Sequence, residues 1–439
     1  MSTLTTRRAE KSMFDARWKT ATIALLSAVA MTITACGGGD DAPARQDTAA
    51  PAAWSAIATT AVQQDAAANP PGLAPMDESR AYAMAFAASH DALNAIDRRY
   101  KPYLTDTTAS EASADAAVAA AVHDVMTATV PSQAAYLDAQ YTQELAKVSD
   151  GASKAAGIAL GQRTAKALLD ARASDGSANA QGPYSQPADP GVYQPTIPVG
   201  VATYVNWGQV KTFVLTSGEQ FRSPPPYRVT DAAYTADYDE MKAIGGMTSS
   251  VRTADQSEIA KFWLESTPGT FARIAAKVAV AQNMNGWDQA RLFAMVELAE
   301  ADAYTTSLET KYFYKFWRPI TAIRAGDADG NPDTAGDPTW TPFDFVTPPV
   351  PDYPSAHAGA AGAGAAVLQA FFGDAATFTY TSTSLPTATR SFTSFSQVAN
   401  EIGLSRIYVG YHFRLAVTEG LKQGQSVGSY VAQHALAPS

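Results

Sequence analysis

The chain has 439 residues, of which 46% are hydrophobic and 17% charged, enough to bury one large core or two smaller ones. A net charge of −10 argues against a nucleic acid partner, because an acidic surface repels the phosphate backbone. The single cysteine excludes an intramolecular disulfide, so packing must supply the stability.

Residues 1–36 have the plan of a secretory signal peptide. A basic stretch ends at Lys19, an apolar run covers 21–30, and the sequence Ile-Thr-Ala-Cys ends at Cys36. The apolar run is short for a membrane-spanning helix, and the four last residues resemble a bacterial lipobox, whose cysteine is lipidated. We therefore predict export to the periplasmic side and a lipid anchor at Cys36. Because Gly37 gives no acidic retention signal, the outer membrane is the expected destination.

The next part of the chain predicts a tether followed by helices. Residues 37–72 are rich in Ala, Gly, Asp, Gln and Pro without a sustained apolar period, which indicates a flexible tether. An N-terminal helical bundle is predicted over 73–250. Its expected helices are 76–99, with apolar residues at helical spacing, and the Ala-rich segments 111–128, 132–147 and 152–173. The prolines of 178–230 predict a long irregular connection lying over these helices.

A second helical bundle is predicted over 251–439. It opens with Thr253-x-x-Gln256, the pattern of a capping box. Further helices are expected at 270–283, 287–309, 311–324, 356–371, 391–408 and 412–434, and 378–383 has strand character. The predicted fold class is therefore all-α, built from two packed helical bundles.

The first chemically notable segment of the second bundle runs from Lys311 to Pro319. Lys311 and Arg318 lie seven residues apart, which predicts that they share one face of a helix. The residues between them are mostly aromatic and favour burial. Two buried cations without an acid between them indicate a bound anion.

Two further segments predict groups that complete an oxyanion pocket. Ser355 follows a proline and can cap the helix after it, whose free N–H groups attract oxyanions, and His357 would lie in the first turn. Arg406 and His412 lie six residues apart, out of phase on a regular helix. Gly410 allows a break between them, so that both can face the same pocket.

The three segments taken in order resemble the signature of the superfamily of type 2 phosphatidic acid phosphatases and vanadium haloperoxidases. That signature reads Lys-x6-Arg-Pro, Pro-Ser-Gly-His and Ser-Arg-x5-His, and this chain departs from it only at Ala356, which replaces glycine and keeps the backbone N–H. Residues 78–103 are similar to the opening helix of bacterial haloperoxidase-like members. The resemblance covers nearly all of the chain from about residue 72 and implies two helical bundles, with the oxyanion site in the C-terminal one.

The resemblance implies how the anion is held. Lys311, Arg318 and Arg406 would neutralise the oxygens of vanadate or phosphate, and the directed donors of arginine suit this task. Ser355 and the N–H of Ala356 would donate further hydrogen bonds. Asp302, shortly before Lys311 in the chain, is expected to lie behind the arginines as their partner; a capping or surface role is the alternative.

The resemblance also implies roles for the two histidines in a haloperoxidase. His412 would bind vanadium axially, and His357 would move protons as the acid–base group. The bound vanadate would act as a Lewis acid toward hydrogen peroxide, and halide would be oxidised to hypohalous acid. The halide is left open, because Val350 stands where family members often carry an aromatic residue or histidine.

The same pocket suits a phosphatase that hydrolyses phosphate monoesters, which would need no cofactor. His412 would then attack phosphorus, and His357 would protonate the leaving oxygen. The phosphatase signature usually places an aspartate four residues after the last histidine, and Ala416 occupies that position. A metal-binding histidine tolerates the missing acid better than a nucleophile does, so we favour the haloperoxidase.

A non-enzymatic oxyanion-binding lipoprotein is the third alternative. Such a protein would keep the cations but has no need for His357, whose presence counts against it. The remaining histidines, His90, His123 and His434, are interpreted as structural or surface groups. Large helical members of the superfamily often pair, so a homodimer is expected as well.

Overall fold

The computed structural model describes residues 47–70, 72–344 and 346–439. Within these ranges the chain forms thirteen α-helices, a few short 3₁₀ turns and one two-stranded hairpin, which confirms the all-α prediction. None of the helices in these ranges combines the length and apolar character needed to cross a membrane. The predicted signal peptide with Cys36 and the first part of the predicted tether lie outside the described residues.

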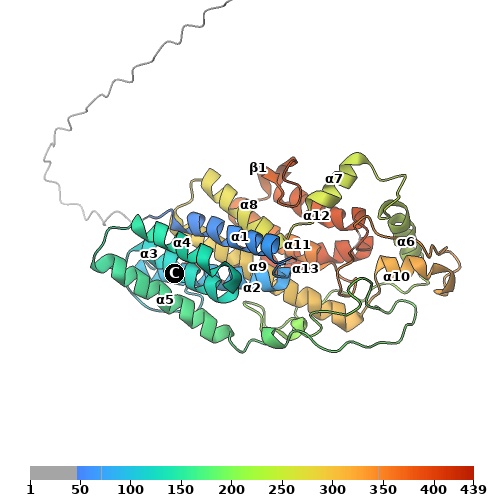
Figure 1. The fold of residues 1–439 in the computed structure, drawn as a ribbon, viewed down its shortest axis with the longest axis horizontal. Helices are drawn as coiled ribbons and strands as arrows, with labels where there is room; N and C mark the ends of the chain where they lie inside the picture. The colour runs from blue at the N-terminus through green and yellow to red at the C-terminus, as the bar shows by residue number, and fades with distance from the viewer. Residues whose placement is uncertain (1–46, 71, 345) are drawn as a thin grey trace, which may run out of the picture. The chain divides into compact units, whose positions relative to one another are not determined.

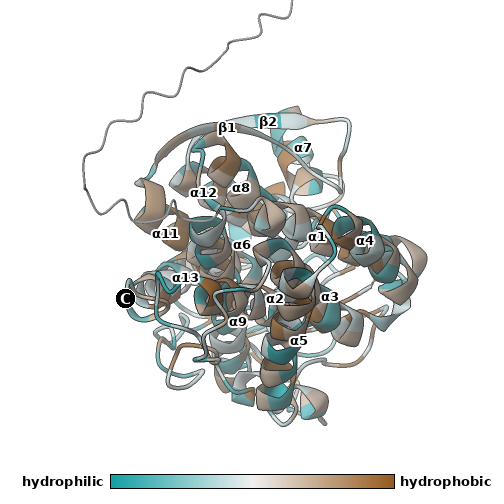
Figure 2. Cartoon of the chain, turned by 90° about the vertical axis from the view of Figure 1, so that its left-hand side faces the viewer, coloured by the Kyte–Doolittle hydropathy of each residue, from teal (hydrophilic) through white to brown (hydrophobic). Residues whose placement is uncertain are grey.

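The N-terminal helices pack together and are drawn in blue and green in Figure 1. They are α1 (Ala50–Ala68), α2 (Pro75–Ile96), α3 (Ala114–Thr129), α4 (Ala134–Ala146) and α5 (Ala152–Arg172). Pro75 at the first position of α2 and the side chain of Ser113, which caps α3, fix two of the starts. Helices α4 and α5 carry hydrophilic segments, shown in teal in Figure 2, because much of their surface faces solvent.

The prediction of a flexible tether over 37–72 is wrong for Ala50–Ala68, which form the largely buried helix α1. Trp54, Ile57, Ala58, Ala61 and Val62 recur at helical spacing and pack into the main core. The segment around this stripe is rich in alanine and polar residues, so composition concealed the period that burial against α3 and α8 reveals. Ordered structure therefore starts before residue 72.

A long connection follows α5, as the prolines predicted. Between Arg172 and α6 (Ala232–Ile244) the only helical pieces are the 3₁₀ turns Ser177–Asn179 and Trp207–Gln209. The connection lies against α9: the carboxylate of Asp302 accepts hydrogen bonds from the backbone N–H groups of residues 213–215. This use of Asp302 bears on the site described below.

The C-terminal elements follow α6 and carry the signature motifs. They are α7 (Ala254–Phe262), α8 (Thr267–Ala281), α9 (Gly286–Tyr314), α10 (Pro319–Arg324), α11 (Ala356–Phe372), β1 (Ala375–Thr381), β2 (Thr389–Ser394), α12 (Phe395–Tyr408) and α13 (Arg414–His434). The capping box of Thr253 and Gln256 is present as predicted. The expected helix 391–408 begins only at Phe395, because residues 389–394 pair with β1 in an antiparallel hairpin.

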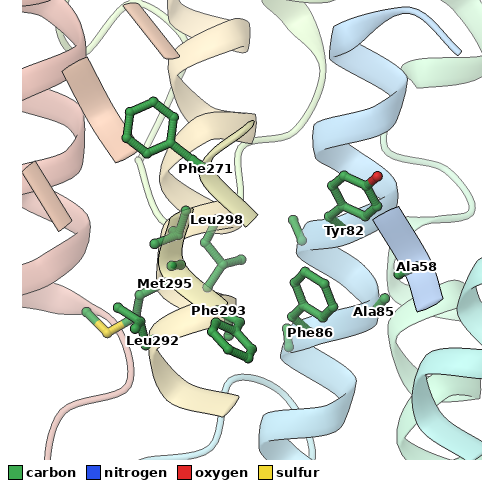
Figure 3. Close-up of a cluster of buried hydrophobic side chains, with 14 of the residues drawn as sticks. Ala58, Tyr82, Ala85, Phe86, Phe271, Leu292, Phe293, Met295 and Leu298 are labelled. Atoms are coloured by element: carbon green, nitrogen blue, oxygen red, sulfur yellow. The ribbon is translucent and has the colours of Figure 1, made fainter. Parts of the chain in front are cut away.

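Helix α9 lies between the two groups of helices and joins their cores. It packs against α2 on one side and against α11 and α13 on another. Figure 3 shows Tyr82 and Phe86 of α2 facing Phe293 of α9, and the rings of Phe86 and Phe293 lie 6.2 Å apart. One continuous apolar core thus contains residues from both predicted bundles, and the N-terminal helices support the helix that carries Lys311.

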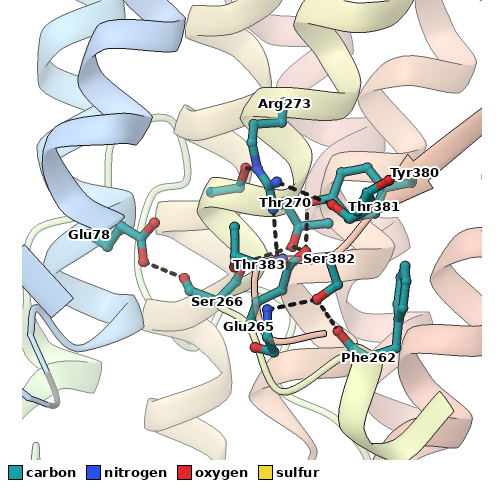
Figure 4. A network of polar contacts seen from close by, with 12 residues as sticks. Glu78, Phe262, Glu265, Ser266, Thr270, Arg273, Tyr380, Thr381, Ser382 and Thr383 are labelled. Atoms are coloured by element: carbon teal, nitrogen blue, oxygen red, sulfur yellow. Dashed lines mark hydrogen bonds and ion pairs between the residues drawn. The ribbon is translucent and has the colours of Figure 1, made fainter. Parts of the chain in front are cut away.

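A polar network ties the segment between α7 and α8 to its neighbours. Figure 4 shows Glu265 of this segment bonded to Arg273 and Thr383, and Ser266 donating to the carboxylate of Glu78 from α2. The Glu78 side chain is buried, and this desolvation raises the pKa of its carboxyl group to about 7, although the hydrogen bond from Ser266 opposes the rise.

The stability of the protein is expected to fall with rising pH through this carboxyl group. An unfolded chain releases the Glu78 proton near pH 4.5, whereas the folded chain holds it to about pH 7. Between these two pH values the folded state binds more protons than the unfolded state, so stability falls over this range and levels off above about pH 7. Glu78→Gln mimics the protonated form and should exceed the wild type by up to about 3 kcal/mol at pH 8, with little difference near pH 4. Denaturant unfolding at both pH values measures this, with the exposed Glu111→Gln as control. Parallel pH dependence of wild type and Glu78→Gln would contradict the argument.

Helices α11 and α13 approach each other closely because glycines line their contact. A Cβ atom on Gly424 would lie 1.8 Å from the carbonyl oxygen of Gly359, and one on Gly420 would lie 2.5 Å from that of Ser355. Backbone therefore touches backbone at this crossing. Since α11 begins just after Ser355 and α13 begins two residues after His412, the crossing fixes two of the motif segments relative to each other.

Candidate active site

The motif segments meet at the C-terminal end of α9, where the structure places Lys311 and Arg318 differently from the prediction. Helix α9 ends at Tyr314, and Lys315 has a left-handed φ of 54°. Arg318 is the N-cap of α10, and Pro319 is the first residue of that helix. The expectation of one shared helix face is therefore wrong, because two residues of special backbone geometry break the helix between the cations.

Both cations nevertheless donate hydrogen bonds to the same segment of the chain, residues 350–352. The Lys311 ammonium donates to the carbonyl oxygens of Pro351 and Asp352 at 2.6 and 2.8 Å. The Arg318 Nε donates to the carbonyl oxygen of Val350 at 2.8 Å. Both side chains are only 1% exposed, so the two charges are held in the interior by backbone carbonyl groups that carry no net charge.

Ser355 caps helix α11 as predicted. Its hydroxyl oxygen accepts a hydrogen bond from the N–H of Ala358 at 3.4 Å, and its own N–H donates to the carbonyl oxygen of Ala416 at 2.8 Å. The first-turn N–H groups of Ala356 and His357 have no acceptor within the helix, so they are available to an anion at this end.

His412 lies in the short turn between α12 and α13. Gly410, with φ of 89°, makes this turn possible, as predicted: a Cβ there would lie 2.4 Å from the carbonyl oxygen of Gly245. The imidazole contacts Arg318, whose Nη1 lies 3.0 Å from Nε2 of the ring. The same Nη1 lies 3.3 Å from Nδ1 of the ring, and Nδ1 lies 2.8 Å from Oδ1 of Asp352.

Arg406 and His357 share a contact with the segment between α7 and α8. Arg406 Nη1 donates to the carbonyl oxygen of Trp263 at 3.0 Å, and His357 also bonds to this carbonyl. The Arg406 guanidinium lies against the ring of Tyr411, 4.9 Å from its centroid. Its Nε is buried and has no hydrogen-bond partner among the described residues.

The electrostatics of these groups show a crowded cluster of positive charge. Burial lowers the pKa of Lys311 and of His412 well below their ordinary values, and the positive charge of Arg318 adds to both effects. Burial likewise lowers the pKa of His357, with a contribution from Arg406, and lowers the pKa of the Arg406 guanidinium to about 10. Both imidazoles are therefore neutral at physiological pH.

Asp352 is the one carboxylate that forms an ion pair with this cluster in the described part of the chain. Burial raises its pKa to about 7, against the opposing effects of Arg318 and Lys311. One acid does not balance three buried cations, and the Nε donor of Arg406 is free. The residues therefore fit a tetrahedral oxyanion, which would supply the missing negative charge and accept the free donor.

The structure does not place Asp302 behind the arginines. Its oxygens accept hydrogen bonds from Phe213, Val214 and Leu215, and the nearest influence of an arginine on its pKa comes from Arg172. The acid beside Arg318 is Asp352, which the sequence interpretation did not single out. Its position, three residues before the motif serine, was the available signal.

The remaining histidines take part in local contacts away from the cluster. His90 bonds to the carbonyl oxygen of Lys101, His123 lies between Asp124 and Asp138, and His434 bonds to the carbonyl oxygen of Tyr430. Val350 packs in a small apolar cluster with Trp207 and Leu308. The described residues contain no group of three His, Cys, Asp or Glu side chains placed to bind a metal cation.

Comparison with known proteins points to one family. Residues 291–438 match the family model described as the second helical-bundle domain of VCPO. A segment of 189 residues is 31% identical to the vanadium chloroperoxidase of Curvularia inaequalis. That segment covers 36% of this chain and 30% of the fungal protein, so less than a third of the length of this curated relative is matched.

Solved structures share the fold over most of the chain. The first bacterial vanadium-dependent iodoperoxidase superposes with a TM-score of 0.75 at 24% identity, over 88% of this chain and 96% of its own. The holo form of a bacterial vanadium-dependent chloroperoxidase gives a TM-score of 0.66 at 16% identity, over 82% and 92%. The likeness extends through the N-terminal helices, beyond the part that the family model matches.

Proposed function

Through residues 291–438 the chain belongs to the superfamily of vanadium-dependent haloperoxidases, and from this premise we propose that it is a vanadate-dependent haloperoxidase. The proposed reaction reduces hydrogen peroxide to water and oxidises a halide ion to hypohalous acid, with uptake of one proton. The observation that carries the proposal is the set of three buried cations with a single carboxylate and a free arginine donor.

The cations would hold vanadate from three directions. Arg318 and Arg406 supply directed N–H donors and Lys311 supplies charge, while Ser355 and the N–H of Ala356 donate at the end of α11. Burial strengthens each of these interactions, because little water competes for the anion. When bound, vanadate supplies the Lewis acidity that activates hydrogen peroxide toward halide.

The two neutral imidazoles suit the remaining tasks. A neutral His412 has one ring nitrogen free to bind the anion's central atom, and both of its ring nitrogens lie close to Nη1 of Arg318. His357, in the first turn of α11 beside Arg406, has a lowered pKa and can accept a proton from hydrogen peroxide and return it. The carbonyl oxygen of Trp263 orients this ring.

The phosphatase remains the second candidate, and one observation supports it. The sequence argument against it was that Ala416 leaves His412 without an orienting acid. Asp352, from another segment of the chain, places a carboxyl oxygen 2.8 Å from Nδ1 of the ring, so the absence of an acid at position 416 does not disfavour a nucleophilic His412. The preference for the haloperoxidase now rests on the family match and on the shared fold.

One experiment separates these readings. The purified full-length protein is freed of bound anion, loaded with orthovanadate and assayed for dye halogenation with hydrogen peroxide and iodide, bromide or chloride in turn. We expect vanadate-dependent halogenation that inorganic phosphate suppresses by competition. Hydrolysis of a phosphate monoester, inhibited by vanadate and without halogenation, would assign the phosphatase instead. Vanadate binding without either activity would leave an oxyanion-binding protein.

We also propose that the protein is exported and lipid-anchored through Cys36, on the evidence of the signal-like N-terminus alone. Expressed in a bacterial host with radiolabelled palmitate, the wild type should carry the label and fractionate with membranes, whereas Cys36→Ser should lose both properties. An unlabelled wild type would contradict lipidation. Pairing of two copies likewise stays a prediction, which the solution mass would test.

A further inference from the structure

The β-hairpin of β1 and β2 packs against the segment between α7 and α8, where Trp263 lies. The ring of Tyr380, from β1, stacks on the indole of Trp263, with the ring centroids 5.6 Å apart and an angle of 10° between the planes. The indole Nε1 donates a hydrogen bond to Oε1 of Glu401, in α12, at 2.9 Å. The hairpin and α12 therefore hold the side chain of Trp263 together.

Glu265 fastens the same segment to the hairpin. Its Oε1 accepts hydrogen bonds from the hydroxyl groups of Thr270 and Tyr380, at 2.8 and 2.6 Å. Its Oε2 accepts from Arg273 at 2.7 Å, and from both the N–H and the hydroxyl group of Thr383 at 2.6 Å. Figure 4 shows these donors around the one carboxylate. Because Glu265 is buried, its loss would leave donors of α8 and of the hairpin without an acceptor.

The main chain of this segment reaches the candidate site through the carbonyl oxygen of Trp263. This oxygen accepts from Nη1 of Arg406 at 3.0 Å, and the guanidinium lies against the ring of Tyr411, 4.9 Å from its centroid. A guanidinium is planar, and its N–H groups point in fixed directions. Fixing one nitrogen and the plane therefore fixes the direction of the Nε–H group, which is buried and has no partner among the described residues. The position of the Trp263 carbonyl thus decides where this free donor points.

We propose that Glu265 is a positioning residue of the oxyanion site, which acts on Arg406 through the Trp263 carbonyl. The proposal rests on the proposed function, since it assumes that Arg406 donates to the bound anion. Glu265 touches no anion in this role. Its bonds to the hairpin hold the main chain at Trp263, two residues earlier, and this main chain holds the guanidinium. Vanadate and phosphate should depend on Glu265 alike, because both would accept from the same donor.

The test is a double-mutant cycle on the purified, anion-free, full-length protein. Calorimetry gives the dissociation constants of orthovanadate and of inorganic phosphate for the wild type, Glu265→Gln, Arg406→Lys and the double variant. We expect Glu265→Gln to weaken both anions by about 10-fold, but by less than about 2-fold when Arg406→Lys is already present, because residues of one hydrogen-bond network are coupled. Removal of a negative charge would by itself favour an anion, so a loss of affinity reports the position of Arg406 and not the charge. The free energy of unfolding should fall equally in both backgrounds.

Asp374→Asn is the matched control. Asp374 precedes β1 and accepts hydrogen bonds from Gln369 and Ser396, at the end of the hairpin that joins α11 and α12. Its substitution should leave both anion affinities at the wild-type level, even if stability falls. Tyr380→Phe serves if Glu265→Gln does not fold, because it keeps the ring stacked on Trp263 and removes one hydrogen bond to Glu265. It should weaken both anions less strongly, and again only when Arg406 is present.

The outcomes separate the two proposals. Equal weakening by Glu265→Gln with and without Arg406 would show a merely structural effect, and unchanged or tighter binding would show that Arg406 is held in place without Glu265. Either result overturns the inference but leaves the haloperoxidase proposal standing. A wild type that binds neither anion would overturn the proposed function, and this role of Glu265 with it. Wild-type affinity in Arg406→Lys would remove Arg406 from the site and overturn the inference as well.

Discussion

His412→Ala is expected to weaken vanadate binding by at least about 100-fold, or about 2.8 kcal/mol, and to reduce halogenation to background. The substitution removes the imidazole that lies between Arg318 and Asp352, and with it the only nitrogen placed to bind the anion's central atom from this turn. Vanadate would then be held by charge and hydrogen bonds alone, as phosphate is. Its affinity should therefore approach that of phosphate, which is expected to change little.

Calorimetry with both anions, together with the halogenation assay, checks this expectation. His434→Ala is the matched control, because His434 is exposed near the C-terminal end of α13 and bonds only to the carbonyl oxygen of Tyr430. It should retain wild-type behaviour in both assays. If His412→Ala kept the wild-type affinity for vanadate, His412 would not be the ligand, and the role proposed for it would fail.

Gly424→Ala is expected to lower the free energy of unfolding by about 3 kcal/mol or more, although alanine in a helix is intrinsically better than glycine by about 1 kcal/mol. The added Cβ would lie 1.8 Å from the carbonyl oxygen of Gly359, and backbone cannot rotate away as a side chain can. Helices α11 and α13 must separate, and this displaces Ser355 and His412 relative to each other. Vanadate affinity should fall along with stability.

Thermal and denaturant unfolding measure the loss, and Ser426→Ala on the exposed side of α13 is the control for substitution by alanine in this helix. The control should leave both stability and vanadate affinity close to wild type. A Gly424→Ala protein as stable as the control would mean that α11 and α13 are not in the close contact that the structure shows.

The helical character of the chain and its motif chemistry could be predicted from local sequence. Helix starts carry their own signals, as in the capping box of Thr253 and Gln256 and the cap of Ser355. The break at Gly410 was predictable because a left-handed turn favours glycine. The site residues could also be predicted, because a buried charge costs free energy unless a partner compensates it. They are Lys311, Arg318, Arg406 and the two motif histidines.

Where local signals were weak or ambiguous, the prediction failed. The aromatic residues after Lys311 fit a helix and predict that it continues to Arg318, yet Lys315 takes a left-handed conformation and α9 stops at Tyr314. Composition favours a tether over helix α1, because the segment is rich in alanine, glutamine and aspartate, which are equally common in flexible segments. In both places the deciding contacts come from residues distant in the chain.

The sequence by itself determined which groups this protein brings to its chemistry: three cations, two histidines and a capping serine, all encoded in short motifs, together with a fold of helices. Only the tertiary structure decided how those groups meet. It assigned Asp302 to the backbone of residues 213–215 and gave His412 a carboxylate from Asp352, sixty positions earlier in the chain. Contacts of this kind depend on distances that packing sets, and spacing along the chain carries no record of them.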